Sequence, residues 1–167
     1  MNNSDKIVIR KSPTADTRTC DWSKVTRQEL WRSSFQHIHD VVAGMKMFGE
    51  MMYRAGVLHD RDKLDDIKRF HAHFATGFKQ TTWWDNHRKI SRHHLNMADG
   101  VPADVNLLDV LEHITDCVMA GMARSGSVTP LELPDDVLQK AFANTVELLK
   151  SRVVVGEAAR AAGGEAL

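Results

Sequence analysis

Histidines and carboxylates are the residues of this sequence best suited to chemistry. The chain has nine histidines against one tyrosine, and most of the histidines lie between His37 and His94. Within this stretch His59 and Asp60 are adjacent, and a neutral imidazole beside a carboxylate offers two good ligands to a divalent ion. The alternative role for Asp60 is to cap the helix that follows. The pair therefore indicates a metal site only if further ligands join it.

Further ligands are available on the predicted helices before and after this pair. His39 lies at the margin of an apolar helical stripe, from which it either faces a cleft or packs half-buried. Asp109, Glu112 and Asp116 recur at steps of three and four residues, which places their carboxylates on one helical face. Such a face is either solvated or neutralised by a cation at Asp116.

A second group of basic residues precedes this acidic helix. His87 and His94 are expected on one side of a two-turn helix with His93 beside them, where two of the three could bind a second metal or a phosphate. Arg88 and Arg92, one turn apart, either clamp a phosphate through forked donors or lie on a solvated face. The segment is therefore a candidate for metal and substrate binding.

Two neighbouring features bear on substrate contacts. Lys63 projects on the same side of its predicted helix as Ile67 and Phe70, so its ammonium either reaches the cleft or snorkels at the surface. In the cleft it would stabilise phosphoryl oxygens. For Trp83 and Trp84 we expect burial in the core rather than stacking on a nucleobase.

Helices must position all these residues. The spacing of Thr26 and Glu29 is that of a capping box, which predicts a long helix from there to about Arg54 to Gly56. Apolar periodicity predicts further helices over about 60–78 and 83–97, from Asn106 to about Gly126, and after Pro134. The apolar stripes expected in the core are Trp31, Phe35, Ile38, Val42, Met45, Gly49 and Met52 in the first helix, and Leu107, Leu111, Ile114, Val118 and Met122 in the fourth.

The fold class that follows is all-α, a compact single-domain bundle of about five to six helices without a strand pair. Residues 1–22 lack sustained periodicity and are interpreted as an N-terminal arm. The helical domain covers 23–153, and the Gly/Ala-rich residues 154–167 form a flexible C-terminal tail. The methionines at 45, 47, 51 and 52 suit a core or an interface, which leaves a homo-oligomer open.

Charge and hydropathy exclude several classes of protein. Lys plus Arg number 22 and Asp plus Glu 22, so the net charge is zero, and we expect no extended nucleic-acid surface. The apolar runs are far shorter than the roughly 18 residues that cross a bilayer. The start lacks an apolar signal core, and two cysteines make no disulfide framework. We therefore expect a cytoplasmic protein without a membrane partner.

Taken in order, the histidine, the His-Asp pair, the later histidines and the aspartate resemble the HD-domain superfamily of metal-dependent phosphohydrolases. A closer resemblance is to a small HD-like family common in bacteriophages, which would place the protein in the host cytoplasm. It covers about residues 35–150 and is carried by His59-Asp60-Arg61-Asp62-Lys63, His87, Ser91-Arg92-His93-His94 and the run from Leu108 to Asp116. Asp62 stands where that family tends to have serine, and Ser91 where it tends to have asparagine. Both departures concern substrate contacts rather than the metal.

The resemblance implies an all-helical fold and one or two divalent metal ions per chain, of manganese, cobalt, zinc, iron or magnesium. The residues it implies as ligands of a first ion are His39, His59, Asp60 and Asp116. Additional ligands would come from His87, His93 and His94. The implied catalytic residues are Lys63 and an acid or base, for which Glu112 ranks ahead of Asp62. Arg88 and Arg92 are the candidate substrate-binding residues.

The implied activity is hydrolysis of a nucleotide phosphoester by metal-activated water, of the 5'-nucleotidase or deoxynucleotide phosphohydrolase type. One alternative is a phosphodiesterase of cyclic or linear signalling nucleotides. Another is a non-catalytic helical binding module that a metal ion stabilises. Metal binding without turnover would favour this last class.

Overall fold

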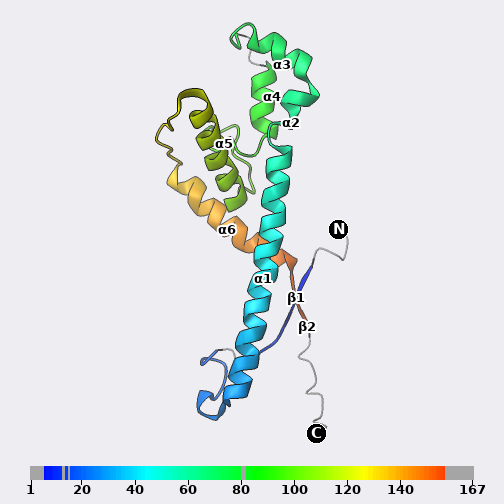
Figure 1. Cartoon of the computed structure of the whole chain (residues 1–167), viewed down its shortest axis with the longest axis vertical. Coiled ribbons are helices and arrows are strands. Elements are labelled where there is room, and N and C mark those ends of the chain that lie inside the picture. Colours follow the sequence, from blue (N-terminus) through cyan, green and yellow to red (C-terminus); the bar gives the residue numbers. More distant parts are fainter. Residues whose placement is uncertain (1–5, 13, 15, 80–81, 157–167) are drawn as a thin grey trace. The chain divides into compact units, whose positions relative to one another are not determined.

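Helices make up most of the chain, as the apolar periodicity predicts. The computed structural model describes residues 6–12, 14, 16–79 and 82–156. Its helices are α1 (Arg27–Leu58), α2 (Arg61–Asp65), α3 (Ile67–Phe74), α4 (Thr82–Ile90), α5 (Leu107–Ser125) and α6 (Asp135–Arg152), with a short 3-10 helix at Trp22–Lys24. The all-α fold class is therefore confirmed. The helix expected over 60–78 is divided at Asp66 into α2 and α3, which lie beside α4 just beyond the end of α1 (Figure 1).

The predicted caps set the starts of the two longest helices. At the start of α1 the Thr26 backbone N–H donates to Glu29 Oε2 at 2.8 Å, and the Glu29 N–H donates to Thr26 Oγ1 at 3.2 Å. At the start of α5, Asn106 and Asp109 form a second capping box. The helix ends at Gly126, whose φ of 70° is the left-handed conformation that glycine adopts without a steric penalty.

A short parallel sheet corrects the expectation that the chain has no strand pair. Strand β1 (Ile7–Arg10) pairs with β2 (Val153–Gly156), with Ile7 opposite Val153. Both segments are rich in β-branched residues, which favour strands. Residues 7–10 of the predicted arm and 154–156 of the predicted tail are therefore paired, whereas 157–167 lie outside the described residues.

The chain divides into two compact units. The first unit holds the described residues up to Met47 and from Leu148 onward, and the second unit is Phe48–Glu147. The division falls within α1 and within α6. Every candidate site residue except His39 belongs to the second unit.

The core of the second unit differs from the predicted one. Its central cluster is Leu95, Val105, Val110, Val137 and Ala141. On α5 the buried residues are Leu108, Asp109, Val110 and His113. The predicted core residues Leu111, Ile114 and Met122 are 48%, 40% and 53% exposed instead. The apolar stripe of α5 is real, but the described chain buries an adjacent face of the helix.

The predicted helix over 83–97 is also shorter than expected. Helix α4 ends at Ile90, and the residues from Ser91 to Asn106 form an irregular connection. Arg92 turns toward α5, where it pairs with Asp109, and Leu95 is fully buried. These long-range contacts outweigh continuation of the helix, so His93 and His94 lie on a loop rather than on the same helix as His87.

No helix among the described residues is both long enough and apolar enough to span a membrane.

Gly100 supports the loop that carries His93 and His94. A Cβ at this buried position would lie 2.5 Å from the His94 carbonyl oxygen and 2.8 Å from His94 Cβ. We expect Gly100→Ala to lower the free energy of unfolding by about 1–3 kcal/mol, because the backbone of the loop must shift. Denaturant unfolding measures the change.

The same substitution at Gly49 is the control. Gly49 is exposed within α1, and a Cβ there meets nothing within 4 Å. Gly49→Ala should stabilise the protein by about 0.5–1 kcal/mol, since alanine favours a helix interior over glycine. Equal effects at the two positions would contradict the close approach at Gly100.

Candidate metal centre

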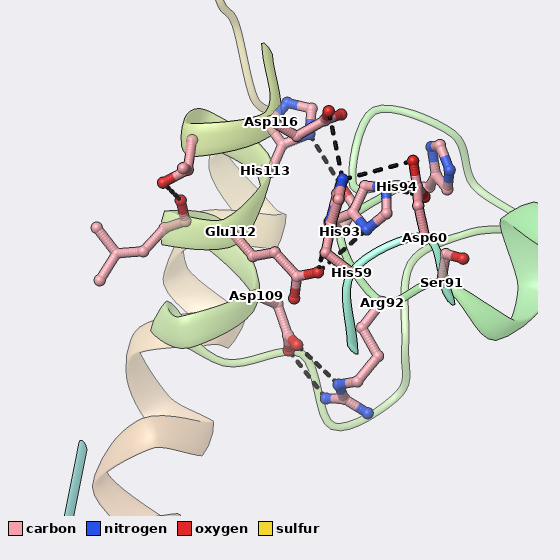
Figure 2. A network of polar contacts seen from close by, with 12 residues as sticks. His59, Asp60, Ser91, Arg92, His93, His94, Asp109, Glu112, His113 and Asp116 are labelled. Carbon is pink, nitrogen blue, oxygen red and sulfur yellow. Dashed lines mark hydrogen bonds and ion pairs between the residues drawn. The ribbon is translucent and has the colours of Figure 1, made fainter. Parts of the chain in front are cut away.

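The candidate site gathers side chains from well-separated segments of the second unit. His59 and Asp60 follow the end of α1, His87 lies on α4, and His93 and His94 lie on the loop after α4. Glu112 and Asp116 face them from α5, as Figure 2 shows. The structure thus brings together all of the metal ligands predicted from the sequence except His39.

A tight turn aims Asp60 at this cluster. Its φ of 53° places it in the left-handed region, which is uncommon for residues other than glycine. Asp60 occupies the capping position of α2, but its side chain makes no capping hydrogen bond. The carboxylate instead faces the imidazoles and the ammonium of Lys63, and it is 19% exposed. The capping alternative is therefore not what the structure shows.

Asp60 and three histidines together could hold a metal ion. Asp60, His87, His93 and His94 each offer one ligand atom, and these atoms all lie within 4.8 Å of one another. Asp60 Oδ1 lies 3.3 Å from His87 Nε2 and 3.6 Å from His93 Nε2, and His94 Nε2 lies 3.0 Å from His87 Nε2. Ligands bound tetrahedrally at 2.0–2.1 Å are about 3.3 Å apart. These spacings therefore suit a single ion.

One atom in this group is left without a partner. Asp60 Oδ1 is buried and makes no hydrogen bond among the described residues. A buried carboxylate oxygen without a donor is costly, because its hydration is lost and not replaced. A cation between this oxygen and the surrounding imidazoles would replace the lost hydration. The residues present therefore fit a divalent metal ion.

Carboxylates on the far side of two imidazoles fix which nitrogen faces Asp60. Nδ1 of the fully buried His87 donates to Asp62 Oδ2 at 2.8 Å. His93 Nδ1 lies 3.3 Å from Glu112 Oε1, and His93 is 2% exposed. Since each Nδ1 carries the proton, each Nε2 presents a lone pair. Asp62 and Glu112, predicted as an acid or base, are placed here as partners of the candidate ligands.

A second, overlapping group lies toward α5. It consists of His59, His93 and Glu112. His59 Nδ1 lies 3.0 Å from Glu112 Oε1, and His59 Nε2 lies 3.4 Å from Asp116 Oδ1. Asp116 thus borders the candidate centre through His59. The two groups share His93, so the described residues offer positions for one or two ions.

The electrostatics of the cluster favour ligation at neutral pH. Burial lowers the pKa of His94 to about 4, so its imidazole is neutral. Burial alone would raise the pKa of Asp60, but its hydrogen bond to Lys63 and the nearby positive charges hold the pKa below its usual value. Burial opposes ionisation of Glu112 too, and hydrogen bonds from His93 and His59 keep its pKa low. Neutral imidazoles and ionised carboxylates are the ligand forms a metal requires.

His39 does not join the centre, in contrast to the ligand set that the resemblance implies. It lies in the middle of α1, where its Nδ1 donates to the Phe35 carbonyl oxygen at 2.9 Å. His39 belongs to the first unit, whereas both candidate metal groups consist of residues of the second unit.

The two candidate substrate-binding arginines are engaged within the protein. Arg92 binds Asp109 through Nε at 2.7 Å and Nη2 at 2.8 Å, and Nη1 also contacts Asp104 at 3.0 Å. The hydrogen bond to Asp109 raises the pKa of Arg92 further above its usual value. Arg88 binds Asp85 and Asp99. The forked donors of both arginines therefore hold the loop, as Figure 2 shows for Arg92 and Asp109.

Sequence reasoning missed His113, which supports the site from α5. It is 5% exposed, and its Nδ1 donates to the His93 carbonyl oxygen at 2.8 Å. His113 follows Glu112 directly and lies four residues after Asp109. This position beside the predicted acidic face is the signal that could have identified it.

A pocket of about 350 Å³ opens beside the cluster. Its walls include Lys63, Trp84 and His94 on one side and Asp116 and Arg124 on α5. Trp83 is buried and stacks on His87 with ring centroids 5.1 Å apart, which confirms its predicted packing role. Trp84 is half-buried in the pocket wall. The pocket thus combines cationic and aromatic groups beside the candidate metal ligands.

Comparison with known proteins gave no match to a family model, a curated protein or a solved structure.

Asp109 anchors the loop through Arg92 and also caps α5, so its removal should be costly. Asp109→Asn should lower the free energy of unfolding by about 2–3 kcal/mol, because a buried charge-assisted pair is lost. The control is Asp104→Asn. Asp104 binds the same guanidinium, but its side chain is 80% exposed against 5% for Asp109, and its loss should cost less than about 1 kcal/mol. Denaturation curves with equal midpoints for the two variants would refute this assignment.

Proposed function

We propose that this chain is a metal-dependent phosphohydrolase that acts on a nucleotide. The observation that carries the proposal is the buried, unpartnered Asp60 Oδ1 facing the Nε2 atoms of His87 and His93. Asp60, His87, His93 and His94 would hold the ion. When bound, such an ion polarises a phosphoester and lowers the pKa of water from 15.7 toward about 7.

The neighbouring side chains have separate roles in this proposal. Asp62 and Glu112 hold the rings of His87 and His93 with Nε2 toward Asp60. Such outer partners raise the basicity of the ligating nitrogen and fix the ring. Asp62 and Glu112 are therefore positioning residues. Asp116, which lies on the pocket wall 3.4 Å from His59 Nε2, is the carboxylate placed to accept a proton there.

The pocket supports a small phosphorylated substrate rather than a polymer. Its volume of about 350 Å³ is near the lower end of small-molecule pockets. Lys63 and Arg124 line it, and cations beside the reacting group stabilise phosphoryl oxygens. The zero net charge argues against an extended nucleic-acid substrate.

A non-catalytic, metal-stabilised module is the second candidate. The observation that favours it is the engagement of Arg88 and Arg92 with aspartates, which removes the phosphate clamp that the resemblance implies. Under this alternative the ion would stabilise the fold without turnover. A phosphodiesterase would share the same ligands, and the products distinguish it from a phosphatase.

The first test measures metal binding. Purified protein loaded with manganese, cobalt, zinc or magnesium should retain at least one ion by elemental analysis. Asp60→Asn should weaken binding at least tenfold, since it removes the negative charge at the centre of the ligand set. Asp65→Asn is the control, because Asp65 is 60% exposed and pairs with Arg61. Unchanged metal content in Asp60→Asn would remove the basis of the proposal.

The second part of this test measures turnover on the loaded protein. Phosphate release from nucleoside monophosphates and deoxynucleotides, and cleavage of cyclic and linear dinucleotides, should be screened together. Asp60→Asn should lower the rate at least a hundredfold, and Asp65→Asn should retain it. Tight metal binding without turnover on any substrate would replace the hydrolase by the binding module.

A further inference from the structure

The first half of α1 exposes its large apolar side chains. Those between 49% and 65% exposed are Leu30, Trp31, Phe35, Ile38, Val41, Val42 and Met45. Five of them follow one another at steps of three and four residues, and we call these five the α1 seam: Trp31, Phe35, Ile38, Val42 and Met45. The buried residues of α1 are instead Ser33 and Gly44, which are both small. An isolated helix gains most of its stability by packing an apolar face. Within the described part of the chain, α1 buries little of its own apolar face.

The spacing of the seam has a specific meaning. Its residues follow one another at steps of four, three, four and three, and Gly49 and Met52 continue the pattern. This is a repeat of 3.5 residues, the period at which two helices supercoil with their apolar seams in contact. A helix packed on a globular core has a broader stripe with period 3.6. The α1 seam therefore fits another helix of the same kind.

The seam is also separate from the face that α1 uses within the first unit. A Cβ on Gly44 would lie 3.7 Å from Leu149 Cδ1 of α6. At 100° per residue, Ser33 and Gly44 lie 20° apart around the helix, and Ile38 lies about 120–140° from both. A partner on the seam would therefore leave the contact of Gly44 with α6 in place.

We propose that the chain forms a homodimer in which the α1 seam packs against the α1 seam of a second copy. This inference is independent of the proposed hydrolase activity. A two-fold axis brings the same surface of both copies together, and a seam of uniform spacing is complementary to itself. No other chain is needed to complete such an interface.

The area available agrees with this partner. Exposed aromatic and aliphatic side chains of this size bury on the order of 100–150 Å² each, so the seam and Val41 together bury roughly 600–900 Å² per copy. A standard interface buries about 800 Å² per partner. Trp31 and Phe35, whose rings stack at 5.1 Å, form the aromatic part of the seam, and aromatic anchors dominate interface energies.

The test is the mass of the full chain in solution by light scattering or sedimentation. The wild type should have twice the 18.8 kDa mass of the chain. Val42→Glu should raise the dissociation constant of the dimer at least a hundredfold, because it places a charged side chain within the apolar seam of each copy. Val57→Glu is the matched control, since Val57 is on the same helix and is 57% exposed against 58% for Val42, but lies off the seam.

Helix content by circular dichroism shows whether each variant folds, and Ile38→Glu provides a second seam variant should Val42→Glu unfold. A monomeric wild type, or a Val42→Glu and Ile38→Glu pair that both remain dimeric, would overturn the proposal. Equal dissociation by Val57→Glu would overturn the assignment of the interface to the seam.

Discussion

A carboxylate that is largely withdrawn from water must be stabilised by positive charge or hydrogen-bond donors. Asp60, in the second unit, is such a carboxylate. The side chain accepts from Lys63 on one oxygen and faces His87 and His93 with the other. The Asp60 backbone has a φ of 53°, and its side chain makes no capping hydrogen bond to α2. Strain and a lost cap persist only where surrounding contacts compensate. A cation held by these residues would supply that compensation.

The loop that carries His93 and His94 depends on anchors far away in the sequence. Arg92 ties it to Asp109 at the start of α5, and His113 holds the His93 carbonyl. Further along, the Asn144 side chain donates to the Val105 carbonyl oxygen at 2.8 Å, and Leu95 and Val105 are completely buried. Polar anchors and apolar burial thus act on the same segment. An irregular loop is as fixed as a helix when its backbone groups are satisfied in this way.

Local signals predicted the parts of this protein that local forces determine. The capping box at Thr26, the start of α5 at Asn106 and its end at Gly126 were predicted correctly because each involves residues within one turn. The end of α4 was missed because it depends on Arg92 reaching Asp109, seventeen residues away. The pairing of Ile7 with Val153 was missed for the same reason. The order of histidines and aspartates predicted most members of the cluster, but it did not show that His39 stands outside both candidate metal groups.

Apolar periodicity shows that a helix has an apolar face, but it does not show what covers that face. In α5 the chain buries Leu108 and Val110 and leaves Leu111 and Ile114 substantially exposed, and in α1 the whole seam is exposed. A small core offsets little of the conformational entropy lost on folding. A chain of this kind therefore gains further stability from what binds its folded state. A metal ion at Asp60 would act on the second unit and a second copy at the α1 seam on the first, so each would stabilise a different part of the chain.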